Sequence, residues 1–204
     1  HYRPRPRRRA GPLCADADAG VIREAVTQTP ALRLTRLTLT DFRNYAGLRL
    51  DCGAALMALT GPNGMGKSTL IRRIVDGLSI PAERLVYVPQ EIDRETSREI
   101  LERIRSLSHE EAGKLLTVVS RLGSRPDRLL ESKEPSPGET RKMLLALGIV
   151  KVPYLIIMDE PTNHMDLPSI ECLEQALAEC PCGLLLVSHD LRFLRMLAKT
   201  RWNI

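Results

Sequence analysis

A glycine-rich segment followed by lysine and serine carries the strongest chemical signal in the sequence. Residues 61–68 read GPNGMGKS, which has the spacing of a phosphate-binding loop. Glycines allow backbone N–H groups to approach phosphate oxygens, and the N-terminus of the following helix favours anions. Lys67 is then placed to neutralise the β and γ phosphates, and Ser68 to offer an oxygen to Mg²⁺. The segment therefore predicts binding of a nucleoside triphosphate and magnesium.

Two acidic residues follow an apolar stretch much later in the chain. Asp159 and Glu160 come directly after residues 155–158, LIIM, which have the composition of a buried parallel strand. In open α/β sheets, ligands bind at the carboxyl ends of the strands, so both carboxylates are expected beside the phosphates. We expect Asp159 to hold Mg²⁺ through water, and Glu160 to polarise the attacking water as general base.

A histidine and a glutamine also follow predicted strands. His189 comes after the apolar run 183–187 and is placed to contact the γ-phosphate. Gln90 ends the segment LVYVPQ, and it is expected to bind either Mg²⁺ or the attacking water. Together with Glu160, these two side chains form the predicted catalytic set.

Apolar periodicity indicates the elements that must position these side chains. Alternating leucines predict a strand over residues 32–40, and after a turn at 44–47 a second strand over 48–52. The segment 56–78 runs from an apolar strand through the glycine-rich loop into a helix with one apolar face. The remaining predicted elements are a strand at 85–90, a helical stretch at 96–122, a helix at 138–149, a strand at 154–160, a helix at 168–179 and a strand at 183–189.

This order of elements predicts the fold class. Within the helical stretch, Ser108 and Glu111 have the spacing of a capping box, so a new helix should begin there. Strands that alternate with helices indicate an α/β protein. We therefore expect a nucleoside triphosphatase of the phosphate-binding-loop type, with a mostly parallel sheet and an N-terminal antiparallel β segment. A short helical subdomain is expected at about 91–148.

Length and composition indicate one folded unit. The chain has 204 residues, of which 43% are hydrophobic and 27% charged, as in a globular protein. No apolar run approaches the roughly 18 residues that span a bilayer, so membrane insertion is not expected.

The five cysteines (14, 52, 172, 180 and 182) lack the spacing of a disulfide framework or zinc site. Cys180 and Cys182 are too close in sequence for an ordinary disulfide, and we expect reduced thiols.

The basic charge of the protein belongs to one terminus. The formal net charge is +5, and the first nine residues, HYRPRPRRR, contain five arginines and no acid. Without them, 25 basic residues face 25 acidic ones. The interpretations are a solvated tail and a contact with RNA or another polyanion. Residues 1–30 lack apolar periodicity and are predicted to form a disordered leader or the end of a linker, so that the folded domain comprises 31–204.

Taken together, these segments resemble the nucleotide-binding cassette of ABC ATPases. GPNGMGKST is similar to its Walker A motif, VPQ to its Q-loop and SPGE to its signature. LIIMDEP is similar to its Walker B motif with the catalytic glutamate, NHMD to its D-loop and VSHD to its H-loop. All six occur in the order found in the family, over about residues 32–204.

The resemblance implies ATP and Mg²⁺ as ligands, and it assigns further residues to them. Ser68, Gln90 and Asp159 are the implied metal-binding residues. The implied nucleotide-binding residues are Gly61, Pro62, Asn63, Gly64, Met65, Gly66, Lys67, Ser68, Thr69, Ser136, Gly138, Glu139 and Asp166. Cassettes of this family often stack an aromatic side chain on adenine; Phe42 or Tyr45 is a candidate, and either is equally a core or turn residue.

The signature departs from the family pattern. It usually reads LSGGQ, whereas here it reads PSPGE, in which Pro137 removes a backbone N–H and Glu139 replaces glutamine. In the family this loop approaches the γ-phosphate bound by a second cassette, and the chain contains one cassette. The expected partner is therefore a second cassette, either as a homodimer or as the missing half of a longer protein.

Three functions are compatible with the motifs. DEPTNHMDLPSIECLEQAL and SHDLRFL are most similar to the ABC-F subfamily, cytoplasmic ATPases that act at the ribosome. This resemblance implies a cytoplasmic location and a ribosomal or rRNA partner. The first alternative is the ATP-binding subunit of an ABC transporter, although transporter cassettes more often read SALD where this chain reads NHMD. The second is a RecF-like DNA-repair ATPase, which only LTDFRNY supports.

Overall fold

The computed structural model describes the C-terminal five-sixths of the chain, with gaps. The described residues are 36–42, 45–51, 56–60, 67–78, 80–126, 129, 132, 134–198 and 200–203. The predicted leader 1–30 and residues 61–66 of the phosphate-binding loop lie outside them.

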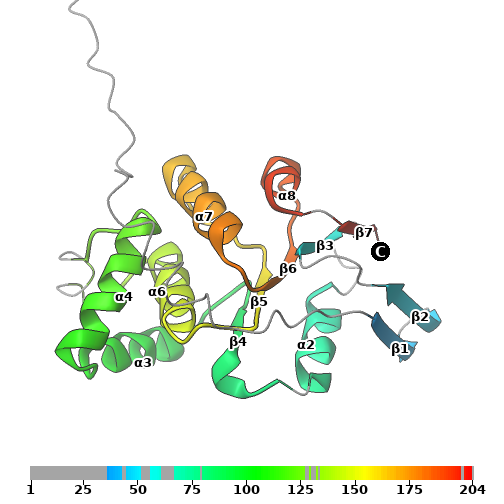
Figure 1. Cartoon of the computed structure of the whole chain (residues 1–204), viewed down its shortest axis with the longest axis horizontal. Helices are drawn as coiled ribbons and strands as arrows, with labels where there is room; N and C mark the ends of the chain where they lie inside the picture. Colours follow the sequence, from blue (N-terminus) through cyan, green and yellow to red (C-terminus); the bar gives the residue numbers. More distant parts are fainter. Residues whose placement is uncertain are drawn as a thin grey trace, which may run out of the picture.

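A parallel sheet forms the centre of the molecule (Figure 1). Its order is β4-β5-β6-β3-β7, and each neighbouring pair is parallel. The strands are β3 (Leu56–Thr60), β4 (Leu85–Val88), β5 (Leu155–Asp159), β6 (Gly183–Val187) and β7 (Thr200–Asn203). Because all five run in the same direction, their carboxyl ends lie along one edge of the sheet. The predicted α/β class with a mostly parallel sheet is confirmed.

Both faces of the sheet are covered, which explains the nearly continuous apolar runs of β5 and β6. Ile156 and Met158 of β5 enter the same hydrophobic cluster as Leu184 and Leu186 of β6. The alternate residues of both strands enter a second cluster with residues of α2 (Lys67–Gly77). Side chains alternate across a strand, so strands covered on both faces must be apolar throughout. In Figure 1, α2 lies on one side of the sheet and α7 (Leu167–Glu179) on the other.

The predicted N-terminal antiparallel β segment is present as a separate two-stranded sheet. Strand β1 (Arg36–Phe42) pairs with β2 (Tyr45–Asp51), and Phe42 lies opposite Tyr45. The turn predicted at residues 44–47 was wrong, because Tyr45, Ala46 and Gly47 belong to β2. Tyrosine favours a strand, and the strand pairing outweighed the turn preference of Gly47. The side chains of Phe42 and Tyr45, the candidates for adenine stacking, lie outside the described residues.

Three helices occupy the region between β4 and β5. They are α3 (Arg94–Arg105), α4 (His109–Arg121) and α6 (Pro137–Ile149). The predicted break at Ser108 is confirmed: its hydroxyl accepts from the Glu111 N–H, and the Glu111 carboxylate accepts from the Ser108 N–H at 3.1 Å. The chain also contains the one-turn helix η1 (Ala82–Arg84) before β4, and α8 (Leu191–Leu197) between β6 and β7.

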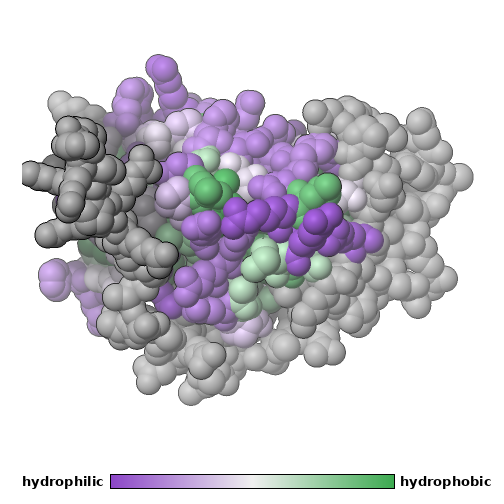
Figure 2. Space-filling view, turned by 90° about the horizontal axis from the view of Figure 1, so that it is seen from above, coloured by the Kyte–Doolittle hydropathy of each residue, from purple (hydrophilic) through white to green (hydrophobic). Residues whose placement is uncertain are grey.

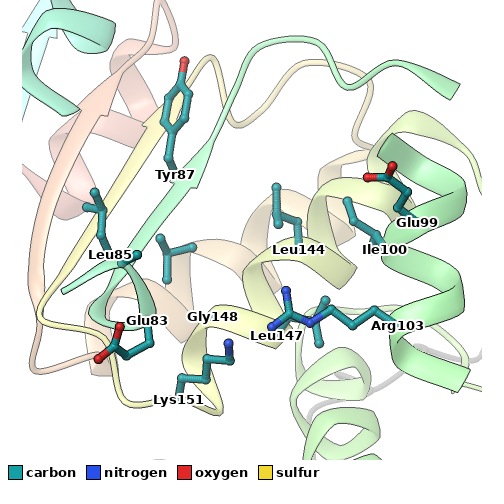
Figure 3. Close-up of a pocket in the computed structure, with 12 residues that line it drawn as sticks. Glu83, Leu85, Tyr87, Glu99, Ile100, Arg103, Leu144, Leu147, Gly148 and Lys151 are labelled. Carbon is teal, nitrogen blue, oxygen red and sulfur yellow. The ribbon is translucent and has the colours of Figure 1, made fainter. Parts of the chain in front are cut away.

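Helix α6 joins the helical region to the sheet. Most of its residues are buried, and it packs against α3, α4 and β4. At Gly148 a Cβ atom would lie 2.2 Å from a methyl carbon of Val86, so only glycine permits this approach of α6 to β4. Beside this contact lies a pocket of about 400 Å³ between β4, α3 and α6, which Figure 3 shows with Tyr87, Ile100 and Leu144 among its lining residues. None of the predicted site residues lines it.

The outer face over α7 and α8 is hydrophilic, as Figure 2 shows, with small and separate hydrophobic spots. The large hydrophobic residues exposed among those described are Leu167, Leu191 and Met196. Within the part of the chain that the structure describes, no helix combines the length and the apolar character that crossing a membrane requires.

Candidate active site

The carboxyl edge of the sheet brings together residues that are far apart in the sequence. Asp159 ends β5 and is 2% exposed, and Glu160 follows it at 7%. His189 follows β6 by one residue, and Lys67 opens α2 after β3. The Glu160 N–H donates to the Val187 carbonyl at 2.7 Å, which ties the end of β5 to the end of β6. Four of the predicted site residues therefore lie at one edge, as the strand order requires.

Lys67, His189 and Glu160 make direct contact. The Lys67 ammonium lies 3.0 Å from His189 Nε2. An ammonium group only donates, so Nε2 accepts and the imidazole proton in this arrangement is on Nδ1. The same Nε2 lies 3.4 Å from Glu160 Oε1, and the His189 N–H donates to Glu160 Oε2 at 3.2 Å. The predicted phosphate-binding lysine, base and γ-phosphate contact thus form one connected group.

The backbone of Glu160 is held in a conformation that side-chain-bearing residues seldom adopt. Its φ is 49°, in the left-handed region. Such a residue costs about 1–3 kcal/mol and persists where its surroundings fix it. Here the hydrogen bonds to Val187 and His189 on the β6 side fix it, and they direct the carboxylate toward the histidine.

The residues present fit a magnesium ion. Asp159 Oδ1 is buried and accepts no hydrogen bond from any residue that the structure describes. A buried carboxylate oxygen without a partner is costly unless a cation or water satisfies it. Helix α2 packs against β5, and its second residue is the half-buried Ser68, a second hard oxygen donor of the kind that Mg²⁺ prefers. Asp159 and Ser68 are thus the described residues best suited to hold the metal.

Two further predicted ligands are exposed, and others lie outside the described residues. Gln90 follows β4 and is exposed, and Thr69 is exposed on the first turn of α2. The backbone cradle of residues 61–66 lies outside the described residues. For these positions the assigned nucleotide and metal contacts stay predictions.

The signature residues Ser136 and Glu139 bond to each other. The Ser136 hydroxyl is the N-cap of α6 and accepts from the Glu139 N–H at 3.3 Å. The Glu139 carboxylate accepts in return from the Ser136 N–H at 2.9 Å. Glutamate in place of the usual glutamine therefore completes a capping box. Pro137 occupies the first helical position, where a missing N–H removes no intrahelical bond.

The glycine of the signature allows close approach of two segments. A Cβ atom on Gly138 would lie 2.8 Å from the carbonyl oxygen of His164, within the segment NHMD. His164 itself has a φ of 63°, so the loop turns sharply there. The start of α6 and the loop after Glu160 are therefore in direct contact, and any larger residue at position 138 would separate them.

Asp166, predicted to contact nucleotide, is the N-cap of α7. Its carboxylate accepts from the Ser169 N–H at 3.2 Å, and the hydrogen bond from the Ser169 side chain lowers the pKa of Asp166. The buried Lys142 of α6 donates to Ser169 Oγ at 2.7 Å. Burial lowers the pKa of Lys142, and the negative charge of Asp166 opposes this effect. Asp166 thus contributes to a polar junction between α6 and α7.

Sequence reasoning missed Arg141, a buried cation beside the predicted site carboxylates Asp159 and Glu160. It is 2% exposed on α6 and donates from Nη1 to the backbone carbonyl of Asn163. Burial lowers the pKa of Arg141, while the negative charges of Asp159, Glu91 and Glu160 oppose this effect. The signal available in the sequence was the basic pair Arg141 and Lys142 immediately before the apolar run MLLAL, where an exposed face is not expected.

Replacing Arg141 by methionine is expected to slow ATP turnover on the order of ten-fold or more, because the loop after Glu160 loses its donor to the Asn163 carbonyl. The midpoint of urea unfolding should change little, since removing a buried cation offsets the lost hydrogen bond. Phosphate release and urea titrations measure the two effects. Arg103→Met, at an exposed position of α3, is the matched control. Unchanged turnover in Arg141→Met would contradict a positioning role.

Comparison with known proteins identifies the family. The family model described as "ABC transporter" matches residues 46–163, more than half of the chain. The ATP-binding protein Uup of Caulobacter vibrioides is 34% identical over 82% of the chain, which spans 29% of the length of that protein. The zinc import ATP-binding protein ZnuC of Buchnera aphidicola is 32% identical over 73% of the chain, which spans 68% of its length.

Solved structures share the fold. The ATP-binding subunit of an ABC transporter superposes with a TM-score of 0.62 at 23% identity, covering 82% of this chain and 83% of that one. The protein cbiO1 from Clostridium perfringens, part of the ABC transporter complex cbiONQ, gives a TM-score of 0.60 at 17% identity and covers 84% of this chain. With the family match over residues 46–163 and the site at the carboxyl edge of the sheet, the chain belongs to the ATP-binding cassettes of the ABC family.

Proposed function

We propose that this cassette hydrolyses ATP to ADP and phosphate when paired with a second cassette, and that it acts as an ABC-F-like factor at the ribosome. The contact of Lys67, His189 and Glu160 beside the buried Asp159 is the observation that carries the ATPase part. It combines a cation for phosphate oxygens, a base and a candidate metal ligand at one edge of the sheet.

Each side chain has a distinct part in the reaction. Lys67 moves its ammonium from His189 to the phosphates, because phosphate oxygens carry more negative charge than a neutral imidazole. Glu160 accepts the proton of the attacking water, and His189 orients the γ-phosphate. Asp159 and Ser68 would hold magnesium, which would supply positive charge beside the phosphate oxygens.

The position of the signature residues supports pairing of this cassette with a second one. Ser136 and Glu139 are exposed or half-exposed at the head of α6, and their hydrogen bonds are to each other. The N–H groups of Ser136 and Glu139 are bonded within the capping box, so the Gly138 N–H and the positive end of the helix dipole are what this helix head offers to an anion brought from outside. A second cassette, as a homodimer or as the other half of a longer protein, supplies that phosphate.

The ribosomal role rests on the segments around the site. NHMD and SHDLRFL resemble the ABC-F subfamily, and the matched share of the chain is larger for Uup, at 82%, than for ZnuC, at 73%. A transporter subunit is the second candidate, because the chain spans a larger share of ZnuC than of Uup. A RecF-like DNA-repair role stays the third, with support only from residues 39–45.

Ribosome co-sedimentation separates these functions. The intact protein carrying Glu160→Gln is expected to pellet with ribosomes in ATP and to be released in ADP, because blocked hydrolysis retains the closed pair. The measurement compares pellet fractions in both nucleotides at two salt concentrations, with Lys67→Ala as the control that does not close.

Three outcomes would contradict the ribosomal role. A transporter subunit would fractionate with membranes through its partner, and a RecF-like protein would bind DNA in ATP. Pelleting that is independent of nucleotide, and lost on removing residues 1–9, would indicate nonspecific binding by the arginine-rich segment.

A further inference from the structure

Two cysteines meet in the short connection between α7 and β6. Cys180 is the C-cap residue of α7, and Cys182 immediately precedes β6. Both are buried, at 7% and 6% exposure, whereas Pro181 between them is exposed. Their Sγ atoms lie 2.6 Å apart. This distance is shorter than the van der Waals contact of two sulfur atoms, so the pair is more than two small apolar side chains filling the core.

The third described cysteine is directed elsewhere. Cys172 lies on α7, and its Sγ faces the end of α4, where it would be 3.2 Å from a Cβ atom at Gly123. None of these three described cysteines forms a disulfide in the structure. Cys180 and Cys182 therefore have each other as the nearest sulfur partner among the described cysteines, despite their close spacing in the chain.

The two sulfur atoms have different roles within the pair. The hydrogen bond from Cys182 lowers the pKa of Cys180, because it stabilises the Cys180 thiolate. The same bond and burial raise the pKa of Cys182. Two thiols in hydrogen-bond contact, one of them with a lowered pKa, are an arrangement in which one sulfur can react with an oxidant and the other can resolve the product.

We propose that Cys180 and Cys182 are a reversible modification site, which a peroxide oxidises to an intramolecular disulfide. The Cys180 thiolate attacks one oxygen of hydrogen peroxide, the O–O bond breaks, and hydroxide leaves; Cys180 becomes a sulfenic acid. Cys182 then loses its proton and attacks Cys180 Sγ, so that the S–S bond forms and hydroxide leaves again. The two sulfur atoms lose two electrons, and with two protons the peroxide becomes two molecules of water.

The position of the two cysteines favours a redox role over a disulfide that only stabilises the fold. A disulfide here closes a loop with one intervening residue, so it removes little entropy from the unfolded chain. Pro181 has a fixed φ, which restricts the loop that holds both cysteines together. Because the two residues are nearly covered, the oxidant must be small, and hydrogen peroxide meets this requirement.

Peptide mapping of the intact folded protein tests the proposal. The protein is treated with hydrogen peroxide, alkylated with iodoacetamide after unfolding, and cleaved after glutamate. Cleavage after Glu174 and Glu179 separates Cys172 from the peptide that begins at Cys180. We expect that peptide to resist alkylation, to weigh two hydrogen atoms less than the reduced form, and to recover both thiols with dithiothreitol. Glutathione added to the same reaction is the positive control, because its oxidation shows that enough peroxide was present to oxidise a thiol.

Variants distinguish the two sulfur atoms. In Cys182→Ser, oxidation of Cys180 should stop at the sulfenic acid, which dimedone labels. In Cys172→Ser, the disulfide should form as in the unchanged protein. Complete alkylation of the Cys180 peptide when glutathione is fully oxidised would overturn the proposal, as would irreversible sulfinic or sulfonic acids as its sole products. The mapping of the unchanged protein keeps the test valid if a variant fails to fold.

Discussion

Glu160→Gln is expected to lower the turnover number for ATP hydrolysis roughly 10²- to 10⁴-fold, the usual contribution of a general base. Glutamine has nearly the same shape, and its amide oxygen can accept from the His189 N–H as Glu160 Oε2 does at 3.2 Å. It has no basic oxygen for the proton of the attacking water. ATP affinity should therefore be kept while phosphate release is lost. Steady-state phosphate release at saturating ATP and Mg²⁺, with nucleotide binding by calorimetry, measures both quantities.

The matched control for this variant is Glu171→Gln. Glu171 is exposed on α7 and pairs with Arg192 at 3.3 Å, away from the site. It should hydrolyse ATP at the normal rate. A comparable loss in both variants would indicate a general effect of removing negative charge, and near-normal hydrolysis in Glu160→Gln would show that another group accepts the proton.

Lys67→Ala is expected to weaken ATP binding roughly ten- to hundred-fold. Hydrogen bonds to charged groups contribute about 1.5–3 kcal/mol, and 1.4 kcal/mol corresponds to a ten-fold change in affinity. The change removes the ammonium that donates to His189 at 3.0 Å in the structure. Calorimetric titration with ATP and with ADP measures the effect, which should be larger for ATP because the γ-phosphate adds charge.

Lys114→Ala serves as the control for lost positive charge. Lys114 is exposed on α4 and pairs with Glu110 at 2.7 Å. Its removal should leave ATP affinity unchanged. Equal weakening in the two lysine variants would contradict the proposed contact of Lys67 with the γ-phosphate. Equal weakening for ATP and ADP in Lys67→Ala would contradict it too.

The sequence predicts the parts of the fold that local patterns determine. β5 and β6 are apolar throughout because both of their faces are covered, and this composition separated them from amphipathic helices. Ser108 gave the start of α4 through a capping box that depends only on residues three apart. Four site residues could be placed at one edge of the sheet because each comes after a predicted strand. The carboxyl ends of parallel strands lie along the same edge.

Features decided by tertiary packing were not predictable in the same way. Gly47 indicated a turn, yet strand pairing absorbed it into β2. The helix α8 has only seven residues and the edge strand β7, which reads TRWN, only four, so neither is long enough to show a clear periodic pattern. Arg141 was missed because its burial depends on the loop at Asn163, 22 positions later in the chain.

The contact of Gly138 with His164 has a thermodynamic consequence. The loop that contains His164 begins at Glu160, whose carbonyl accepts from the Asn163 N–H at 3.2 Å. The head of α6 and Glu160 are therefore connected through a few groups in direct contact. A protein that binds α3 and α4 and shifts α6 would therefore alter nucleotide affinity. Linkage is reciprocal: if such a ligand strengthens ATP binding by some factor, ATP must strengthen binding of that ligand by the same factor.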